Sequence, residues 1–173
     1  MERTRILKQN KNQSCQADDY FHAVTLASRI MRNTANFYIR NTMTGIKKSP
    51  EKRTANETEV LHYVFTGIQK ANLCAMDRYR KILEEATHVS GHTRLLILEK
   101  AFDIVIFSYP TRQKWFLSYE KLYAIFCHTD NPNYRGMYSS LAQNAIKKAC
   151  ADWTNYFASK KKKKKDPSGY KAR

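Results

Sequence analysis

The sequence predicts a mainly α-helical protein, a helical bundle of about four to six helices with a candidate N-terminal β-strand and a basic C-terminal tail. Apolar residues recur every three or four positions through several long segments, as they do on the buried face of a helix. Residues that cap helices precede these segments, and glycine or proline follows them. With 173 residues, of which 42% are apolar, the chain is long enough to form one domain with its own core.

The first predicted helix begins at Asp18 and Asp19, whose carboxylates suit the positive end of a helix dipole. It is expected to reach Thr42 or Thr44, and Gly45 is expected to end it. The apolar stripe of this helix comprises Tyr20, Val24, Ala27, Ile30 or Met31, Ala35 and Tyr38.

Two basic segments flank this helix. Residues 1–17 precede it and contain, at residues 4–8, a weak candidate for a β-strand, with a frayed terminus as the alternative. Residues 46–53, IKKSPEKR, follow it as a loop whose charges are either solvated or in contact with phosphate.

A second long helix is predicted after Thr54. Thr54 and Glu57 have the spacing of a capping box, in which each side chain accepts a hydrogen bond from the backbone of the other residue. The helix is expected to reach Glu85 or beyond, with Gly67 as a point where it bends. The residues expected in its interior are Val60, Leu61, Val64, Ile68, Leu73, Ala75 and Met76.

The spacing of histidine and cysteine does not predict a metal site. Residues 88–92, HVSGH, are predicted to form a turn, and His88 and His92 lack the helix and the glutamate of an HExxH zinc motif. The cysteines contain no CxxC pair, and reduced thiols are the default where no secretory signal is present. The four cysteines are Cys15, Cys74, Cys127 and Cys150.

The region after this turn is less regular. Residues 93–108 are predicted to be helical, although the apolar run at residues 102–107 is also dense enough for a strand. Ser118 is expected to cap a short helix that ends near His128. Residues 130–133, which include a proline, are predicted to form a turn.

The last predicted helix carries apolar residues over most of its length and six consecutive lysines at its C-terminal end, residues 160–165. Ser140 is expected to cap its first turn, with Gln143 three residues further on. One face of this helix therefore packs while its end presents positive charge. Its apolar stripe comprises Leu141, Ala145, Ile146, Ala149, Cys150, Trp153, Tyr156 and Phe157.

The net charge of +16 predicts a polyanionic partner, and nucleic acid is the partner that this charge favours. No run of about 18 apolar residues is present, and no lipidation motif or apolar signal sequence stands out, so we expect no membrane partner. The expected location is the cytoplasm, in association with the nucleoid. No site for a small-molecule substrate is evident in the sequence.

The acidic residues do not predict a catalytic site, because they are scattered and diverge where they are neighbours. No nucleophile elbow or glycine-rich phosphate loop is present either. We therefore expect that the chain is not an enzyme and that it needs no cofactor. The acidic residues considered are Glu57, Glu59, Glu84, Glu85, Glu99 and Asp103.

Two stretches resemble the transposon-encoded TnpB family. Residues 31–48, MRNTANFYIRNTMTGIKK, are similar to the first long helix of that family, in which a pattern of the type YN-x-A-x-Y-x-I-R recurs. Residues 133–173 resemble the segment in which L-x-x-x-x-A-Q-x-x-x-K-x-x-x-x-x-W-x-x-F-F leads to a lysine-rich turn. The matching residues are Asn33, Ala35, Asn36, Phe37, Tyr38, Ile39 and Arg40 in the first stretch, and Ala142, Gln143, Ala145, Lys148, Trp153, Tyr156 and Phe157 in the second.

TnpB proteins are RNA-guided DNA nucleases related to type V CRISPR effectors, and their N-terminal part is a β-rich wedge domain interrupted by a helical recognition domain. The resemblance implies that residues 1–17 hold the first wedge strand and that residues 18–160 form the recognition helices. Residues 50–115 match no family pattern and are expected to be an insertion. Residues 161–173 are implied to be a lysine-rich turn and tail that lead back towards the wedge.

The resemblance also implies partners. The RuvC-like acidic site and the four-cysteine zinc finger of the family lie downstream of the segments matched here. The chain is therefore expected to be an N-terminal fragment, a truncated remnant or a divergent copy split in two. It is expected to bind guide RNA and target DNA through their backbones and to work with a C-terminal nuclease part.

The residues expected to contact phosphate are basic and lie in or beside the two resembling stretches, whereas Trp153 and Phe157 are expected to hold the last helix in place. Two alternatives remain open. One is a duplex-binding regulator with a helix-turn-helix near residues 130–133; the other is a helical protein-interaction module with a solubilising tail. The expected phosphate contacts are Arg40, Lys47, Lys48, Lys147, Lys148, Lys160, Lys161, Lys162, Lys163, Lys164, Lys165, Lys171 and Arg173.

Overall fold

The computed structural model describes the backbone of residues 11–165 and the side chains of residues 17–164. Within this part of the chain the structure is mainly helical and contains no strand, which confirms the predicted fold class. The candidate strand at residues 4–8 lies outside the described residues. The elements are α2 (Lys11–Gly45), the 3₁₀ turn η1 (Pro50–Lys52), α3 (Ala55–Thr87), α4 (Gly91–Phe102), α5 (Tyr119–His128), α6 (Pro132–Arg135) and α7 (Ser139–Lys165).

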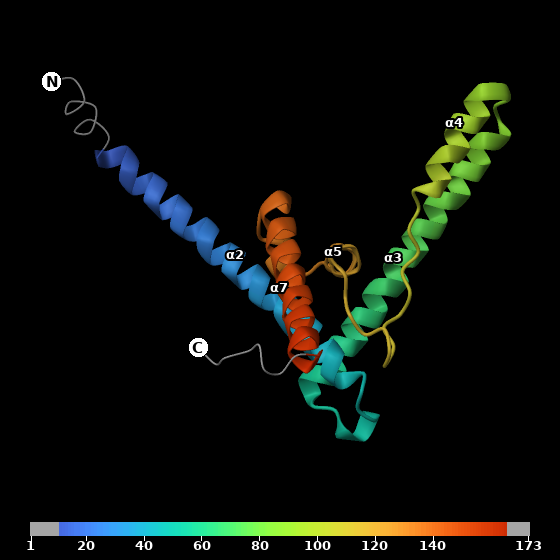
Figure 1. Ribbon diagram of the computed structural model, residues 1–173. Coiled ribbons are helices and arrows are strands. Elements are labelled where there is room, and N and C mark those ends of the chain that lie inside the picture. Colours follow the sequence, from blue (N-terminus) through green and yellow to red (C-terminus); the bar gives the residue numbers. More distant parts are fainter. Residues whose placement is uncertain (1–10, 166–173) are drawn as a thin grey trace.

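The two longest helices set the shape of the molecule. Figure 1 shows α2 and α3 diverging from the short loop that joins them, like the two limbs of a V, with α5 and α7 in the angle between them. Helix α7 packs on α2, α5 packs on α3 and α7, and α4 folds back along the far half of α3. The core therefore forms near the base of the V.

The core is made of apolar side chains from α2, α3, α5, α6 and α7 and from the segment before α5. Burial of each large apolar side chain contributes about 1.5 to 3 kcal/mol relative to exposure, so this cluster stabilises the base of the V. Its largest fully buried apolar members are Phe126, Met31, Ile39, Ile68, Leu117, Leu122, Ile125, Ile146 and Val64.

Helix α2 begins at Lys11, before the predicted start at Asp18, and ends at Gly45 as predicted. The predicted stripe is buried only in its second half, since Tyr20 is 54% exposed whereas Met31 and Ala35 are fully buried. No other described helix covers the first half of α2 in the way that α3 and α7 cover the second. Amphipathic spacing therefore identified the apolar face but not the length over which it is covered.

Gly45 is required by packing. A Cβ atom at this position would lie 3.0 Å from Cβ of Glu57 and 3.1 Å from Cδ1 of Leu61. Gly45 does not have positive φ, so it is not the left-handed cap that ends many helices. The glycine allows the start of α3 to approach the end of α2.

The capping box at the start of α3 is confirmed. The backbone N–H of Thr54 donates to Oε2 of Glu57 at 2.9 Å, and the N–H of Glu57 donates to Oγ1 of Thr54 at 3.2 Å. The helix then continues unbroken through Gly67 to Thr87, in agreement with the predicted end at Glu85 or beyond. Gly67 lies against α5: a Cβ there would lie 2.8 Å from Cγ2 of Ile125 and 3.2 Å from its Cα.

Two residues predicted inside α3 are exposed. Leu73 is 54% exposed and Met76 is 53% exposed, so their assignment to the core is wrong. The reason is that α4 is the main neighbour of this half of α3 and covers only one side of it. The predicted core residues nearer the start of α3 are buried: Val60, Leu61, Val64 and Ile68.

The predicted helix at residues 93–108 is only partly correct. Helix α4 ends at Phe102, and the following residues form neither helix nor strand. The Asn72 side chain holds this segment beside α3, because it accepts from the backbone N–H of Phe107 at 2.8 Å and donates to the Phe107 carbonyl at 2.9 Å. These two bonds satisfy the backbone N–H and C=O groups of Phe107, which have no neighbouring β-strand to bond to.

The C-terminal helices follow the predictions with three differences. The first is that the short helix α6 (Pro132–Arg135) occupies the second half of the predicted turn at residues 130–133. Ser118 caps α5 through its hydroxyl, which accepts from the N–H of Lys121 at 3.4 Å. Helix α7 begins at Ser139, so Ser140 lies inside the helix instead of capping it. The helix also continues through Lys165, so the lysine-rich turn implied by the resemblance is wrong within residues 161–165. Lysine has a good helix propensity, and its charge suits the C-terminal end of a helix.

Candidate nucleic-acid interface

A groove runs along the line where α2 and α7 pack together. It consists of two hollows of about 630 and 610 Å³ that share Arg32 and Asn36, so they form one continuous feature, which we call the α2–α7 groove. The first hollow is lined by Arg32, Asn36, Arg40, Met43, Lys47, Asp152, Trp153, Tyr156, Phe157 and Lys160. The second is lined by Thr25, Ser28, Arg29, Arg32, Asn33, Asn36, Leu141, Asn144, Ala145 and Lys148.

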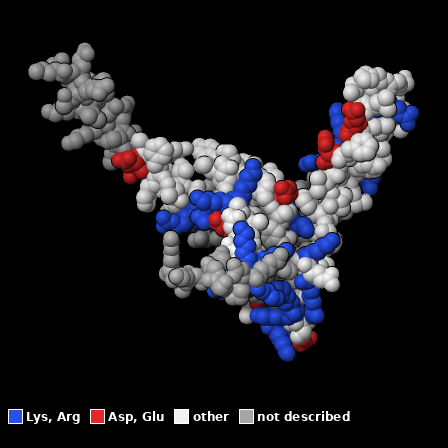
Figure 2. All heavy atoms as spheres, viewed as in Figure 1, with Lys and Arg blue, Asp and Glu red and all other residues white. Residues whose placement is uncertain are grey.

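The ionisable lining of the groove is strongly basic. Asp152 is the one acidic residue among the lining residues, and it forms an ion pair with Arg32 across the groove. Figure 2 shows Lys and Arg side chains gathered over the middle of the molecule and around the loop between α2 and α3. A groove whose charges are mainly of one sign concentrates anions more strongly than dispersed charges do. The basic lining residues are Arg29, Arg32, Arg40, Lys47, Lys148 and Lys160.

Aromatic rings form part of the groove. Trp153 and Phe157 are half-buried and stacked, with ring centroids 5.6 Å apart, and the indole N–H of Trp153 donates to Oδ1 of Asn36 at 3.0 Å. Phe157 also packs edge-on against Trp115, at 5.1 Å between centroids. These contacts fasten the end of α7 to α2 and to the loop before α5, in agreement with the structural role predicted for both residues.

Tyr156 behaves differently from its neighbours. It was assigned to the apolar stripe of the last helix, but 54% of it is exposed where it lines the groove. Its ring is therefore the aromatic surface in the groove that is most open to an unpaired base. Stacking of a nucleic-acid base on an aromatic side chain contributes about 1 to 3 kcal/mol per base.

The structure brings four of the predicted phosphate contacts into one groove: Arg40, Lys47, Lys148 and Lys160. Lys47 lies at the edge, with Nζ 5.2 Å from the centroid of the Trp115 ring. This cation–π contact holds the ammonium at the surface without neutralising it.

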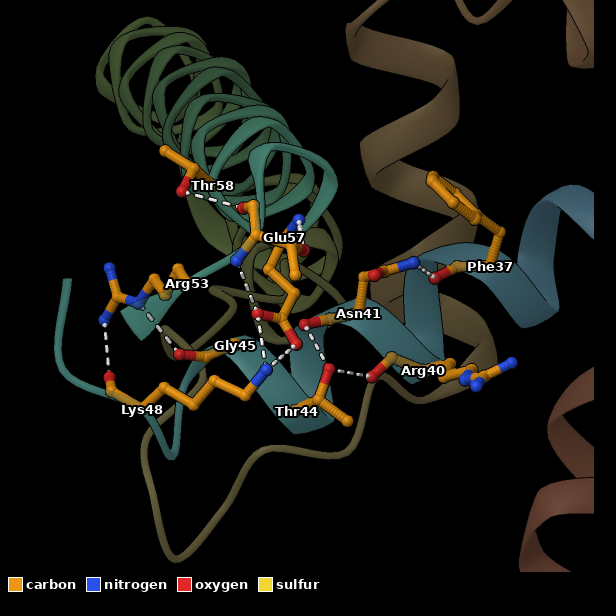
Figure 3. Close-up of polar contacts among 10 residues, drawn as sticks. Phe37, Arg40, Asn41, Thr44, Gly45, Lys48, Arg53, Glu57 and Thr58 are labelled. Carbon is orange, nitrogen blue, oxygen red and sulfur yellow. Dashed lines mark hydrogen bonds and ion pairs between the residues drawn. The ribbon is translucent and has the colours of Figure 1, made fainter. Parts of the chain in front are cut away.

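Two predicted contacts have other partners. Nζ of Lys147 lies 5.0 Å from the centroid of the Tyr119 ring, on the side of α7 that faces α5, away from the groove residue Lys148. Nζ of Lys48 donates to both carboxylate oxygens of Glu57, at 2.7 and 2.9 Å (Figure 3). The Lys48 ammonium therefore stabilises the junction of α2 and α3.

The junction holds Glu57 in its charged form. The Lys48 ammonium and the backbone N–H of Thr54 lower the pKa of Glu57 to about 2. Arg53 strengthens the same corner, since its Nε donates to the carbonyl of Gly45 at 2.9 Å (Figure 3). The basic loop at residues 46–53 is thus divided: Lys48 and Arg53 serve the fold, and Lys47 faces the groove.

The lysine run begins at the end of the groove and continues beyond it. Lys160 lines the first hollow, and residues 161–164 are exposed on the final turns of the helix. Because a helix turns by about 100° per residue, consecutive lysines point in all directions around its axis. The side chain of Lys165, and all of Lys171 and Arg173, lie outside the described residues.

Sequence reasoning did not select Arg29, Arg32 and Asn36, which line the groove together with Arg40. A signal was present, because these positions recur every three or four residues along α2, beside the apolar stripe. The sequence does not show that α7 is the helix that faces these residues. The first groove residue of α7, Leu141, lies more than 100 positions away from them in the chain.

Among the described residues, no group of three or more His, Cys, Asp or Glu side chains is arranged to hold a metal ion. Burial raises the pKa of the Cys150 thiol to about 11, which favours the protonated form over the thiolate that metals require. None of the helices between residues 11 and 165 combines the length and the apolar character needed to cross a bilayer.

Comparison with known proteins gives no family assignment: no family model, curated protein or solved structure matches the chain.

Proposed function

We propose that the chain binds nucleic acid along the α2–α7 groove, through backbone phosphates and without a catalytic site of its own. The observation that carries the proposal is the set of six basic side chains that converge on one groove, with a single acidic residue among them. Backbone phosphate is a regularly spaced anion, and contacts with it supply most of the sequence-independent affinity of nucleic-acid-binding proteins.

The finer proposal is that the ligands are a guide RNA and its target DNA, held as in the TnpB family. What supports it is the position of the two stretches that resemble that family. Residues 31–48 supply one wall of the first hollow, and residues 152–160 of α7 supply the other. Two segments that are distant in the sequence thus meet at the basic groove.

A charge-removal experiment tests the binding site. Replacing Arg40, Lys47 and Lys160 with serine removes three positive charges from the first hollow. The logarithm of the affinity falls linearly with the logarithm of salt concentration, with a slope of about 0.7 to 0.9 per phosphate contact, so the triple variant should flatten the slope by about two to three. Fluorescence anisotropy with a labelled RNA and a labelled duplex, over a salt series, measures both quantities.

The matched control removes the same charge elsewhere. Arg78, Lys81 and Arg94 are exposed on α3 and α4, away from the groove. Their replacement with serine should change the salt slope by less than about half of the change expected for one phosphate contact. Equal losses in the two triple variants would show that the affinity depends on net charge alone, and the proposed groove would then be wrong.

The lysine run provides a second test of the same surface. Replacing residues 160–165 with serine should weaken binding similarly for all sequences and flatten the salt slope, because ammonium–phosphate contacts do not read bases. An unchanged salt slope would show that the lysine run does not belong to the interface.

Competition between structured RNA and duplex DNA separates the finer proposal from a helix-turn-helix regulator. A regulator should prefer one duplex sequence and bind RNA weakly. Helix α6, which begins within the predicted turn, is a poor recognition helix for such a regulator, because it has only four residues and its Tyr134 is buried. A guide-binding lobe should prefer structured RNA.

A further inference from the structure

The far half of α3, helix α4 and the segment after it project from the rest of the molecule. We call residues 72–106 the α3–α4 arm. Figure 1 shows this arm extending away from α2, α5 and α7, and α4 has α3 as its main neighbour. The arm is thus a helical hairpin with one side of each helix unpartnered.

The arm exposes an unusual share of apolar surface. Of the eighteen large apolar side chains that are exposed in the described part of the chain, nine lie on the arm. Surfaces of this kind are normally covered by a partner. The nine are Leu73, Met76, Tyr79, Leu83, Leu95, Leu96, Phe102, Val105 and Ile106.

Part of this surface is hollowed. A depression of about 510 Å³ lies between α3 and the segment that follows α4, and it is large enough to receive side chains of a partner. Its floor and walls are apolar, with the exception of Arg80, which forms an ion pair with Asp77 of the same helix. The apolar residues that line it are Met76, Tyr79, Leu83, Ala101, Ile104 and Ile106.

The charge of the arm differs from that of the rest of the chain. Residues 72–106 contain five basic and five acidic residues, so the arm has no net charge, and the whole excess of +16 lies elsewhere. Figure 2 shows side chains of both signs on the arm. The basic ones are Arg78, Arg80, Lys81, Arg94 and Lys100, and the acidic ones are Asp77, Glu84, Glu85, Glu99 and Asp103.

We propose that the α3–α4 arm is a self-association surface, and that its occupant is the arm of a second copy of this chain. A two-fold interface places the same patch on both sides, so the patch must be complementary to itself. The arm can meet that requirement because it carries a hollow, highly exposed apolar side chains such as Phe102, and residues of both charges. A nucleic acid does not fit the arm, because half of its charges are acidic.

The charge distribution also determines how two copies approach each other. Two molecules of net charge +16 repel each other, and the repulsion is smallest when the neutral arms meet and the basic grooves point apart. Two helical hairpins that join in this way place four helices side by side, which is a common solution for covering apolar helix faces. The resulting dimer would present one basic groove from each copy.

Analytical ultracentrifugation of the full chain tests the proposal. The unmodified protein should sediment as a dimer at micromolar concentration. The dimer should tighten when salt rises from about 50 to about 500 mM, because salt screens the repulsion between the copies. The double variant Met76→Glu, Leu83→Glu places charge in the hollow of both copies, and it should weaken the dimer by at least about 30-fold.

The matched control is Phe21→Glu, Leu26→Glu. These residues are exposed apolar side chains on α2, at 65% and 47%, and their replacement should leave the dimer intact. Far-ultraviolet circular dichroism and nucleic-acid affinity check that the arm variant remains folded, since neither replaced side chain is buried. The proposal is overturned if the unmodified chain is a monomer across the salt series, or if the control dissociates and the arm variant does not. A monomeric chain would leave a different protein as the partner of the arm.

Discussion

The α2–α7 groove and the α3–α4 arm are made from similar amphipathic helices, but they differ in what covers their apolar residues. Near the groove, the apolar faces of α2 and α7 cover each other, and Ile39 and Ile146 are fully buried. On the arm, Leu73 and Met76 remain half exposed. Basic residues accumulate around the covered faces, and balanced charges surround the uncovered ones.

This difference fits the two roles that we propose for the chain. A surface that binds phosphate needs fixed positive charge on a stable support, and the packed base of the V supplies that support. A surface that binds protein needs apolar area without like-charge repulsion. The placement of charge therefore distinguishes regions that helical periodicity alone does not distinguish.

The largest contrast is expected when one large apolar residue is truncated in each region. Ile39→Ala in the fully buried core should lower the free energy of unfolding by about 2 to 5 kcal/mol, because it leaves a cavity among packed side chains. Leu73→Ala on the arm should change it by less than about 0.5 kcal/mol at protein concentrations where the chain is monomeric. Urea denaturation followed by circular dichroism measures both. Equal effects would mean that the arm is covered within the single chain.

Gly67 lies in close contact with α5, a few residues before the arm begins. Gly67→Ala should destabilise the protein by about 1 to 3 kcal/mol, since the new Cβ would lie 2.8 Å from Cγ2 of Ile125 and 3.2 Å from its backbone. The gain of about 1 kcal/mol in helix propensity opposes this loss without removing it. Thermal denaturation checks the sign, and a rise in the melting temperature would show that α5 moves aside easily.

Local features of this fold were predictable from the sequence, and long-range features were not. The capping box at Thr54 and Glu57 and the cap at Ser118 involve residues three positions apart, so their spacing was sufficient. The exposure of Tyr20 and Leu73 depends on whether another helix reaches them, and no local pattern records this.

The candidate site shows the same limit. Arg40, Lys47, Lys148 and Lys160 were selected for their charge, and the structure places all four in one groove. Lys48 was selected for the same reason, but Glu57, nine positions away, binds it. Charge and proximity in sequence do not reveal which lysines already have a carboxylate partner, because that depends on how α2 and α3 meet.

The ion pair at this junction gives a pH dependence. The folded protein holds the pKa of Glu57 at about 2, below its ordinary value of 4.5. A lowered pKa stabilises the fold above pH 4.5, and this contribution is lost as the pH falls from 4.5 towards 2. Glu57→Gln keeps an acceptor for the capping box but removes the charge, so the variant should be less stable than the unmodified chain at pH 7, and the difference should shrink through that window. If the stability difference between the variant and the unmodified chain is constant with pH, the Lys48–Glu57 ion pair is not its cause.

The smallest expected effect is a gain in stability in the packed half of α2. The hydroxyl of Thr42 is buried and has no hydrogen-bond partner among the described residues. Thr42→Val keeps the shape and removes the unpaired group, so it should raise the free energy of unfolding by about 1 kcal/mol. Thr34→Val is the matched control on the same helix, because the hydroxyl of Thr34 donates to the Ile30 carbonyl at 3.0 Å and accepts from Asn133 at 2.9 Å. The control should lose stability, and parallel thermal melts of the two variants should therefore shift in opposite directions. Shifts of the same sign would mean that helix packing at Thr42 depends on its hydroxyl.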